Sequence, residues 1–211
     1  MSAGPELRSL LRAGLEALDQ DLNEVAIQRL LDYLALLRKW NQTYNLTAII
    51  EPEQMITYHL LDSLSLLSLI KGTSLLDVGT GAGLPGIPLS IARPDLGVTL
   101  LDGNGKKTRF VTQVAIELGL KNVKVEQSRI ESFRTAGPGY DNIVSRAFGE
   151  LDLFRSSCLG LLSKQGQLLA MKGRLEESAI SEMEKEGFWA VKRVDLPRVS
   201  DERHILVGTV D

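Results

Sequence analysis

The chain has 211 residues, of which 44% are hydrophobic and 24% are charged, and its formal net charge at pH 7 is -3. This composition is typical of a soluble globular protein and excludes intrinsically disordered and fibrous proteins. The single cysteine, Cys158, excludes an intrachain disulfide and a cysteine-based metal cage, so we expect a protein held together by packing in a reducing compartment, the cytoplasm.

No part of the sequence has the pattern of a targeting or membrane-spanning segment. The first residues, Met1 to Arg8, lack a basic flank followed by an apolar run. The most apolar stretch, Leu60 to Ile70, is interrupted by Asp62 and is shorter than the roughly 20 residues that span a bilayer. We therefore expect neither export nor a membrane partner.

Residues 1–70 predict helices and no strand, and we take them as an N-terminal helical region. Leucines between Glu6 and Leu18 recur at the spacing of three and four that forms one apolar helix face. Asn23 is a suitable N-cap for a second helix that ends near Asn41. Pro52 suits the first position of a third helix, which we expect to run to about Ile70.

Residues 71–211 alternate between strand and helix patterns, which predicts an α/β domain with a mostly parallel sheet covered by helices on both faces. Two β-rich runs at the end, 189–196 and 204–210, are too close together for a helical crossover, so we expect an antiparallel hairpin at the sheet edge. This gives seven strands. The five preceding strands are expected at 74–78, 97–102, 123–126, 141–145 and 167–171, with helices near 108–118, 151–162 and 176–186.

The glycine-rich turn after the first strand is the most informative segment. Its sequence from Leu75 to Pro88 is LLDVGTGAGLPGIP, and the next strand ends at Asp102. In an open parallel sheet, ligands bind outside the carboxyl ends of the strands, where glycines let a ligand approach the backbone and a carboxylate can accept hydrogen bonds from a ribose. The turn and Asp102 together indicate a cofactor that contains adenosine.

Two kinds of adenosine cofactor fit such a turn. Residues 81–86 match the G-x-G-x-x-G pattern of dinucleotide-binding proteins, so a nicotinamide-dependent oxidoreductase is an alternative. Against it, Pro85 removes an amide that a pyrophosphate needs, and Asp77 places negative charge beside the turn. S-adenosylmethionine carries a sulfonium and an ammonium group, so a neighbouring acid favours this cofactor.

The turn and six further segments resemble those of one protein family. The segments are Trp40-Asn41, Tyr44-Asn-Leu-Thr47, His59-Leu-Leu-Asp-Ser63, Ser145-Arg-Ala-Phe148, Met171-Lys-Gly173 and Glu202-Arg-His204. Together they resemble the bacterial guanine-N7 methyltransferases of 16S ribosomal RNA, also called the glucose-inhibited division protein B family, over nearly the whole chain. The resemblance implies a class I methyltransferase fold (Rossmann-like), S-adenosylmethionine as methyl donor, and a guanine in the 530 loop of the small-subunit RNA as substrate.

The resemblance also implies the site residues. The matching positions for the cofactor are Gly79, Leu84, Ile130, Glu131 and Arg146, with Asp102 on the ribose and the turn glycines Gly81 and Gly83 around the methionine part. We further expect Arg146 and Lys172 to position charge on the substrate or cofactor, acting as the catalytic pair. One departure is Gly103, where the family commonly has serine after the ribose acid.

The residue types favour direct transfer to a ring nitrogen. The segment from Ser145 to Phe148 lacks the Asn/Asp-Pro-Pro-aromatic motif of amine methyltransferases, and Cys158 lies among apolar neighbours in an expected helix, unlike a nucleophile. Guanine N7 has an accessible lone pair, so its methylation needs alignment and electrostatics more than a base. His59 and His204 lack companions at metal-ligand spacing, and we expect no metal.

The ratio of acidic to basic residues indicates which form of the RNA the protein can bind. Acidic residues outnumber basic ones, 27 to 24, whereas a free-standing binder of bare RNA is usually basic. We therefore expect the protein to act on 16S RNA already shaped by ribosomal proteins, within a small-subunit particle. Separately, we expect a monomer. An RNA-bound module that keeps the pocket without transferring methyl groups is a second alternative. The candidate RNA contacts, each of which can equally be a solvated surface group, are Lys106, Lys107, Arg109, Lys172, Arg174, Arg198 and Arg203.

Overall fold

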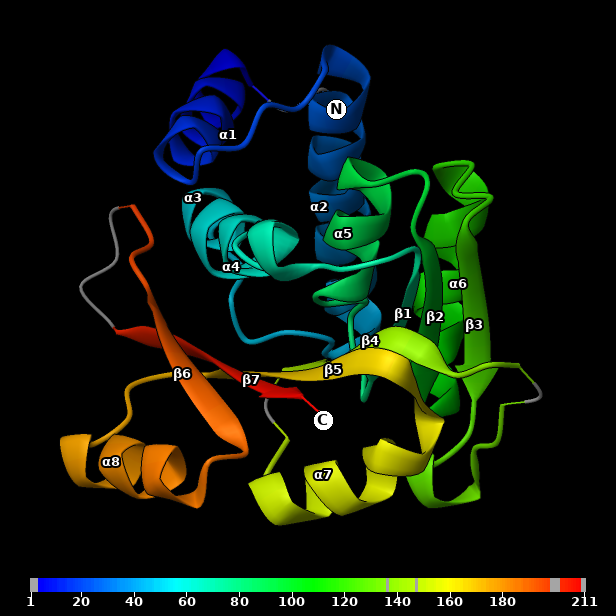
Figure 1. Cartoon of the computed structure of the whole chain (residues 1–211). Coiled ribbons are helices and arrows are strands. Elements are labelled where there is room, and N and C mark those ends of the chain that lie inside the picture. The colour runs from blue at the N-terminus through cyan, green and yellow to red at the C-terminus, as the bar shows by residue number, and fades with distance from the viewer. Residues whose placement is uncertain (1–3, 136, 147, 198–201, 210–211) are drawn as a thin grey trace.

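The protein is built around a seven-stranded sheet in the order β3-β2-β1-β4-β5-β7-β6 (Figure 1). The computed structural model describes residues 4–135, 137–146, 148–197 and 202–209. Strands β1 to β5 are parallel, and β7 is antiparallel to both β5 and β6. The strands are β1 (Ser74–Val78), β2 (Gly97–Asp102), β3 (Val123–Gln127), β4 (Tyr140–Arg146), β5 (Leu162–Lys172), β6 (Trp189–Val194) and β7 (Arg203–Thr209).

The predicted mixed sheet and its C-terminal hairpin are confirmed, with two differences in detail. The antiparallel strand is second from the edge, because β7 inserts between β5 and the outermost strand β6. The expected helix near 151–162 ends earlier, since Leu162 already pairs with Tyr140 at the start of a longer β5. Val210, the expected end of the last strand, lies outside the described residues.

Helices cover both faces of the sheet, which explains why the central strands are almost continuously apolar. Figure 1 shows α5 (Gly86–Ala92) and α6 (Gly105–Glu117) on one side, and α7 (Leu151–Cys158) and α8 (Glu177–Glu186) on the other. Two short 3-10 turns lie in the connections, η3 (Ile130–Ser132) between β3 and β4 and η4 (Leu159–Leu161) between α7 and β5. Each face has its own buried hydrophobic cluster.

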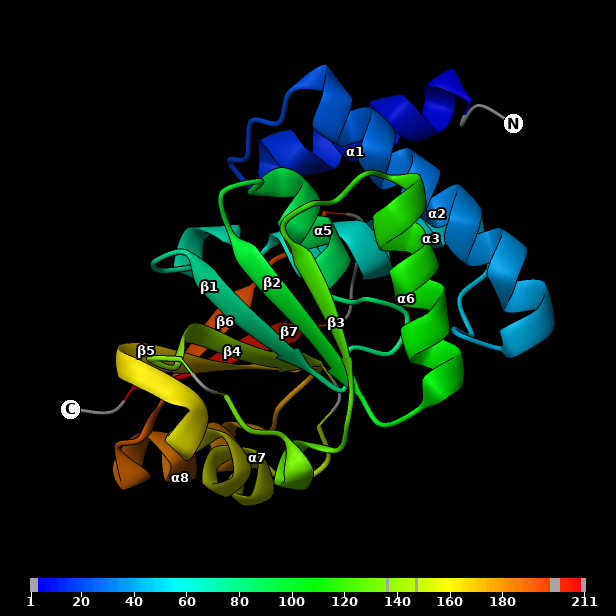
Figure 2. The same cartoon turned by 90° about the vertical axis from the view of Figure 1, so that its right-hand side faces the viewer.

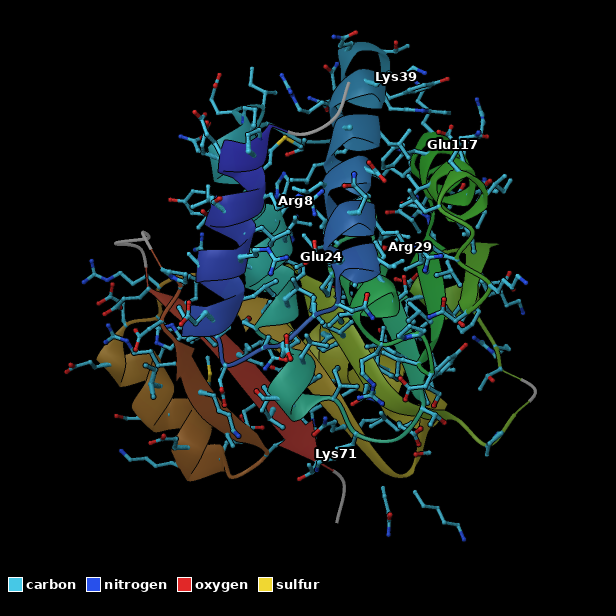
Figure 3. All side chains as sticks on the ribbon, turned by 90° about the horizontal axis from the view of Figure 1, so that it is seen from above. Arg8, Glu24, Arg29, Lys39, Lys71 and Glu117 are labelled. Carbon is cyan, nitrogen blue, oxygen red and sulfur yellow. The ribbon has the colours of Figure 1, made fainter. Side chains whose placement is uncertain are left out.

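The N-terminal helices add a second layer over α5 and α6. Helix α1 (Pro5–Ala17) pairs with α2 (Glu24–Tyr44) through the ion pair of Arg8 and Glu24, whose nitrogen and oxygen lie 3.3 Å apart (Figure 3). Helix α2 runs beside α5 and α6 (Figure 2). Its predicted N-cap is confirmed, because the Asn23 side chain accepts the Ala26 N–H at 2.9 Å. Leucines of both helices share one core with α5 and α6.

The segment from Pro52 to Leu69 is helical but not one regular α-helix. It consists of α3 (Pro52–Met55), the π-helix η1 (Ile56–Leu61), α4 (Asp62–Leu64) and the 3-10 turn η2 (Leu67–Leu69). The expectation of a continuous helix from Pro52 to Ile70 is therefore wrong in its geometry. A π-helical turn shifts the direction of the side chains that follow it, and such turns are frequent at functional sites. Within the described residues, no helix is long and apolar enough to cross a bilayer.

Candidate functional site

The glycine turn leaves β1 with two glycines facing open space. Gly79 has a φ of +70° and Gly81 a φ of +60°, and a Cβ built on Gly79 meets no atom within 4 Å. Gly83 and Gly86 differ, because a Cβ on either would collide with side chains of the core such as Ile87. Gly79 and Gly81 thus line a backbone cradle that any side chain would fill, which is the feature a cofactor requires. Gly83 and Gly86 allow the turn to pack closely on the sheet.

Asp77 stabilises this turn from the buried side, through hydrogen bonds to its side chain. One carboxylate oxygen accepts the Thr80 hydroxyl at 2.6 Å and the Gly86 N–H at 2.9 Å. The other oxygen is buried and has no hydrogen-bond partner among the described residues. Complete burial raises the pKa of Asp77 to about 6. Asp77 therefore shapes the turn from inside the protein and does not present its carboxylate on the cofactor side.

Asp102, at the end of β2, is bonded to the same turn and is almost fully buried. Its two carboxylate oxygens accept the N–H groups of Gly81 at 3.0 Å and Asn104 at 2.8 Å. The ammonium nitrogen of Lys107 lies 3.8 Å from the carboxylate. Each oxygen of an ionised carboxylate can accept more than one hydrogen bond, so these contacts leave acceptor capacity for a ribose.

Ile130 and Glu131 lie in the turn η3, which follows β3 on the same side of the sheet as Asp102. Ile130 is buried in the second core cluster, whereas Glu131 is exposed. Leu84, another expected cofactor contact, has its side chain buried and its N–H donated to the Thr80 carbonyl. Of the eight expected cofactor positions, Gly79 and Gly81 face open space at the turn, whereas Leu84, Ile130 and Asp102 are buried.

A pocket of about 410 Å³ lies next to this turn, at the carboxyl ends of β4 and β5. The strands that lead to the two places are neighbours, and the hydroxyl of Ser145 in β4 donates to the Val78 carbonyl just before Gly79 at 2.7 Å. Five of the six further sequence segments contribute to the pocket, although they are far apart in the chain. The polar and charged side chains that line the pocket include Thr47, Tyr58, His59, Asp62, Arg146, Lys172, Arg203 and His204.

The charged centre of the pocket is Asp62, which lies between two arginines. Nη1 of Arg146 is 3.6 Å from one carboxylate oxygen, and Nε of Arg203 is 3.7 Å from the other. Arg146 also donates to the Tyr58 carbonyl of the π-helix at 3.0 Å. Burial raises the pKa of Asp62, and the two arginines oppose this effect. Sequence reasoning gave Asp62 no role, although a lone acid in the apolar stretch 60–70 was a signal that could have found it.

Lys172 forms the rim of the pocket. Its ammonium group donates to the carbonyl oxygens of Phe148 at 2.7 Å and Gly149 at 3.3 Å. Partial burial lowers the pKa of Lys172. Because the ammonium is bonded to these carbonyls, its contribution to the site in this structure is to hold the segment after β4.

The two histidines make hydrogen bonds within the protein. Nε2 of His59 lies 2.9 Å from the Thr47 hydroxyl, and Nδ1 of His204 lies 3.0 Å from the Gly173 carbonyl. Burial and the neighbouring Arg146 lower the pKa of His59 to about 4, so this imidazole is neutral at pH 7. Across the described ranges, no cluster of three or more His, Cys, Asp or Glu side chains is arranged to hold a metal ion.

The candidate RNA contacts are dispersed. Lys106 and Arg109 are exposed at the start of α6, beside the glycine turn, whereas Lys107 faces Asp102. Arg174 is exposed with its guanidinium 4.0 Å from the Glu202 carboxylate. Arg198 lies outside the described residues.

Comparison with known proteins identifies the family. A model of the rRNA small subunit methyltransferase G family matches residues 26–206. The chain belongs to this family. It is 48% identical over 208 residues to ribosomal RNA small subunit methyltransferase G of Alkalilimnicola ehrlichii, covering 98% of this chain and 94% of that protein. It is 51% identical over 179 residues to the protein of the same name from Chromohalobacter salexigens, covering 85% of each.

Solved structures agree with this family at the level of the fold. A SAM-dependent methyltransferase from Aquifex aeolicus superimposes with a TM-score of 0.60 at 18% identity, covering 82% of this chain and 97% of that one. The predicted class I methyltransferase fold and the resemblance to the family are therefore confirmed. The family also identifies the chain as a methyltransferase, which removes the oxidoreductase alternative.

Proposed function

We propose that this protein transfers a methyl group from S-adenosylmethionine to N7 of a guanine in the 530 loop of 16S ribosomal RNA. One observation supports this most directly: an open glycine turn and a charged pocket lie side by side at one edge of the sheet. The turn suits the donor, and the pocket is within the roughly 300–1,000 Å³ of small-molecule sites, so it can accept one base taken out of its stack.

The donor is assigned to the turn. The backbone of Gly79 and Gly81 holds its methionine part, Asp102 accepts hydrogen bonds from the ribose hydroxyls, and Ile130 with Glu131 borders the adenine. When bound, S-adenosylmethionine supplies an electrophilic methyl group whose transfer forms the N7–C bond and breaks the C–S bond, the electron pair remaining on sulfur. Gly83 and Leu84 support this surface through packing, and Arg146 links it to the pocket.

No residue needs to remove a proton in this reaction. Burial raises the pKa of Cys158 to about 12, so its thiol is neither a nucleophile nor a base at neutral pH. His59 is neutral but bonded to Thr47, and it serves the pocket as a structural group. Direct attack of the N7 lone pair therefore needs only alignment, to which Arg146 and Lys172 contribute by fixing the pocket walls.

The substrate is RNA in an assembled small-subunit particle, and the enzyme acts as a cytoplasmic monomer. The acidic balance of the chain disfavours tight binding to bare RNA, whereas Lys106 and Arg109 provide local positive charge beside the turn. Ribosomal proteins that preshape the 530 loop would supply the remaining contacts.

Transfer of labelled methyl from S-adenosylmethionine to small-subunit particles tests the assignment, with the modified nucleotide mapped by mass spectrometry. We expect 7-methylguanine in the 530 loop, and less product on protein-free RNA. Methylation at another atom or in another loop would overturn the assignment. Equal rates on RNA and particles would overturn only the particle preference. Saturable binding of S-adenosylhomocysteine without any transfer would favour the non-enzymatic RNA module.

A further inference from the structure

Asp62 is a buried acid whose hydrogen-bonding capacity the protein does not use. Its residue is 8% exposed, and it sits in the wall of the 410 Å³ pocket. Among the residues that the structure describes, no side-chain hydrogen bond to either carboxylate oxygen is shorter than 3.5 Å. The flanking guanidinium nitrogens of Arg146 and Arg203, at 3.6 and 3.7 Å, lie beyond hydrogen-bond distance.

Burying a carboxylate destabilises the folded protein unless opposite charges and hydrogen bonds replace its hydration. Asp62 has opposite charges beside it but lacks the hydrogen bonds. The contrast with Asp77 and Asp102 is direct, because each of those acids accepts two hydrogen bonds from the protein. The two arginines favour the charged form of Asp62 against the effect of burial on its pKa, and they leave its lone pairs for a donor that enters the pocket.

The chemistry of the bases selects that donor. A carboxylate pairs best with two adjacent N–H groups, and the Watson–Crick edge of guanine offers this pair in N1–H and the 2-amino group. Adenine and cytosine present an unprotonated ring nitrogen there, and uracil presents a single N–H between two carbonyls. Enzymes that modify a flipped base read this edge by hydrogen bonds.

The position of Asp62 is also consistent with the reacting edge. N7 lies on the side of guanine away from the 2-amino group, with O6 between N7 and N1. Arg146 ends β4, the neighbour of the strand that leads into the glycine turn, and its guanidinium lies 3.6 Å from Asp62. A base whose N1 and 2-amino groups face Asp62 would place O6 near a guanidinium donor and N7 toward the turn.

We propose that Asp62 is the residue that makes the enzyme specific for guanine, by accepting hydrogen bonds from N1–H and the 2-amino group of the target base. This inference rests on the proposed function. Methylation makes the purine ring cationic and N1–H more acidic, so the hydrogen bond to a carboxylate strengthens as N7 reacts. Asp62 then contributes to the rate of transfer as well as to selection.

The test replaces the target guanosine with inosine, which lacks only the 2-amino group, in small-subunit particles reconstituted around ligated RNA. We expect the wild-type kcat/KM to fall by about 10- to 100-fold, the range for losing a hydrogen bond to a charged group. In Asp62→Asn we expect slow transfer to guanosine and a guanosine-to-inosine ratio of less than about threefold. Asp95→Asn, the same change at an exposed acid that pairs with Arg93, should keep the wild-type ratio.

Three results would overturn the inference while leaving the proposed function in place. Equal methylation of guanosine and inosine by the wild-type enzyme would do so without any variant, even if Asp62→Asn failed to fold. Full discrimination in a folded Asp62→Asn would show that another group reads the base. A tenfold weaker affinity of that variant for S-adenosylhomocysteine, with discrimination kept, would assign Asp62 to the cofactor. Absence of 7-methylguanine with normal RNA would instead refute the proposed function itself, and the inference with it.

Discussion

Asp77 should make the native protein less stable as the pH rises. Burial raises its pKa from 3.8 to about 6, so at intermediate pH the folded protein holds a proton that the unfolded chain has lost. The stabilisation is complete below the unfolded pKa and disappears as the pH passes the folded one. A shift of about 2 units corresponds to about 3 kcal/mol, of which about 2 kcal/mol is lost between pH 4.5 and 7.5.

Asp77→Asn removes this titration while keeping one oxygen to accept the Thr80 and Gly86 groups. Urea unfolding of both proteins between pH 4.5 and 7.5, at fixed ionic strength, gives the difference in unfolding free energy at each pH. We expect the wild type to lose about 2 kcal/mol relative to Asp77→Asn over this range. Asp95→Asn serves as the control, because Arg93 lowers the pKa of exposed Asp95 and no such loss should occur. A difference that stays constant with pH would refute the argument from burial.

Three further changes separate cofactor binding, stability and transfer. Gly79→Ala should weaken S-adenosylhomocysteine binding in calorimetry, since its methyl group fills the open side of the turn, and the positive φ should cost about 1 kcal/mol in urea unfolding. Tyr33→Phe should cost about 1 kcal/mol in the same unfolding assay, because the buried hydroxyl no longer donates to the Ala82 carbonyl, and unchanged stability would contradict this. Arg146→Ala should lower the rate of single-turnover methyl transfer at least about tenfold, because the variant loses the charge-assisted hydrogen bond to the Tyr58 carbonyl beside Asp62. An unchanged rate would show that Arg146 has no role in the site.

The strands of the sheet could be predicted because their apolar runs, and the residues that end them, are visible in the sequence. Residues 74–78 and 97–102 are apolar runs that end at an acid or a glycine, and the structure has the same bounds for β1 and β2. Helix α2 was likewise predictable from Asn23 and the leucine stripe. In each case a local rule, the cap or the period, and the global packing agree.

The errors arose where packing decides between local alternatives. Residues 159–161 have helix-like spacing, but Leu162 must pair with Tyr140, so the chain leaves the helix and extends β5. The π-helical turn at 56–61 has no sequence signature in the spacing of its apolar residues. This turn and the residue after it supply both the Tyr58 carbonyl and Asp62, which contact Arg146 in the pocket.

Three aspartates near one edge of the sheet show why residue type alone could not assign the site. Asp77 is fully buried, and one of its oxygens accepts hydrogen bonds from Thr80 and Gly86. Its negative charge therefore lowers the stability of the fold, and its role is to hold the turn. Asp102 is almost fully buried and is tied to two backbone N–H groups, so it shapes the loops, and the ribose role proposed for it uses the remaining acceptor capacity of its oxygens. Asp62 is held only by charge, and its lone pairs remain for an incoming donor. The residue type is the same in all three, and the different roles proposed for them follow from the donors that surround each carboxylate and from whether it lines the pocket.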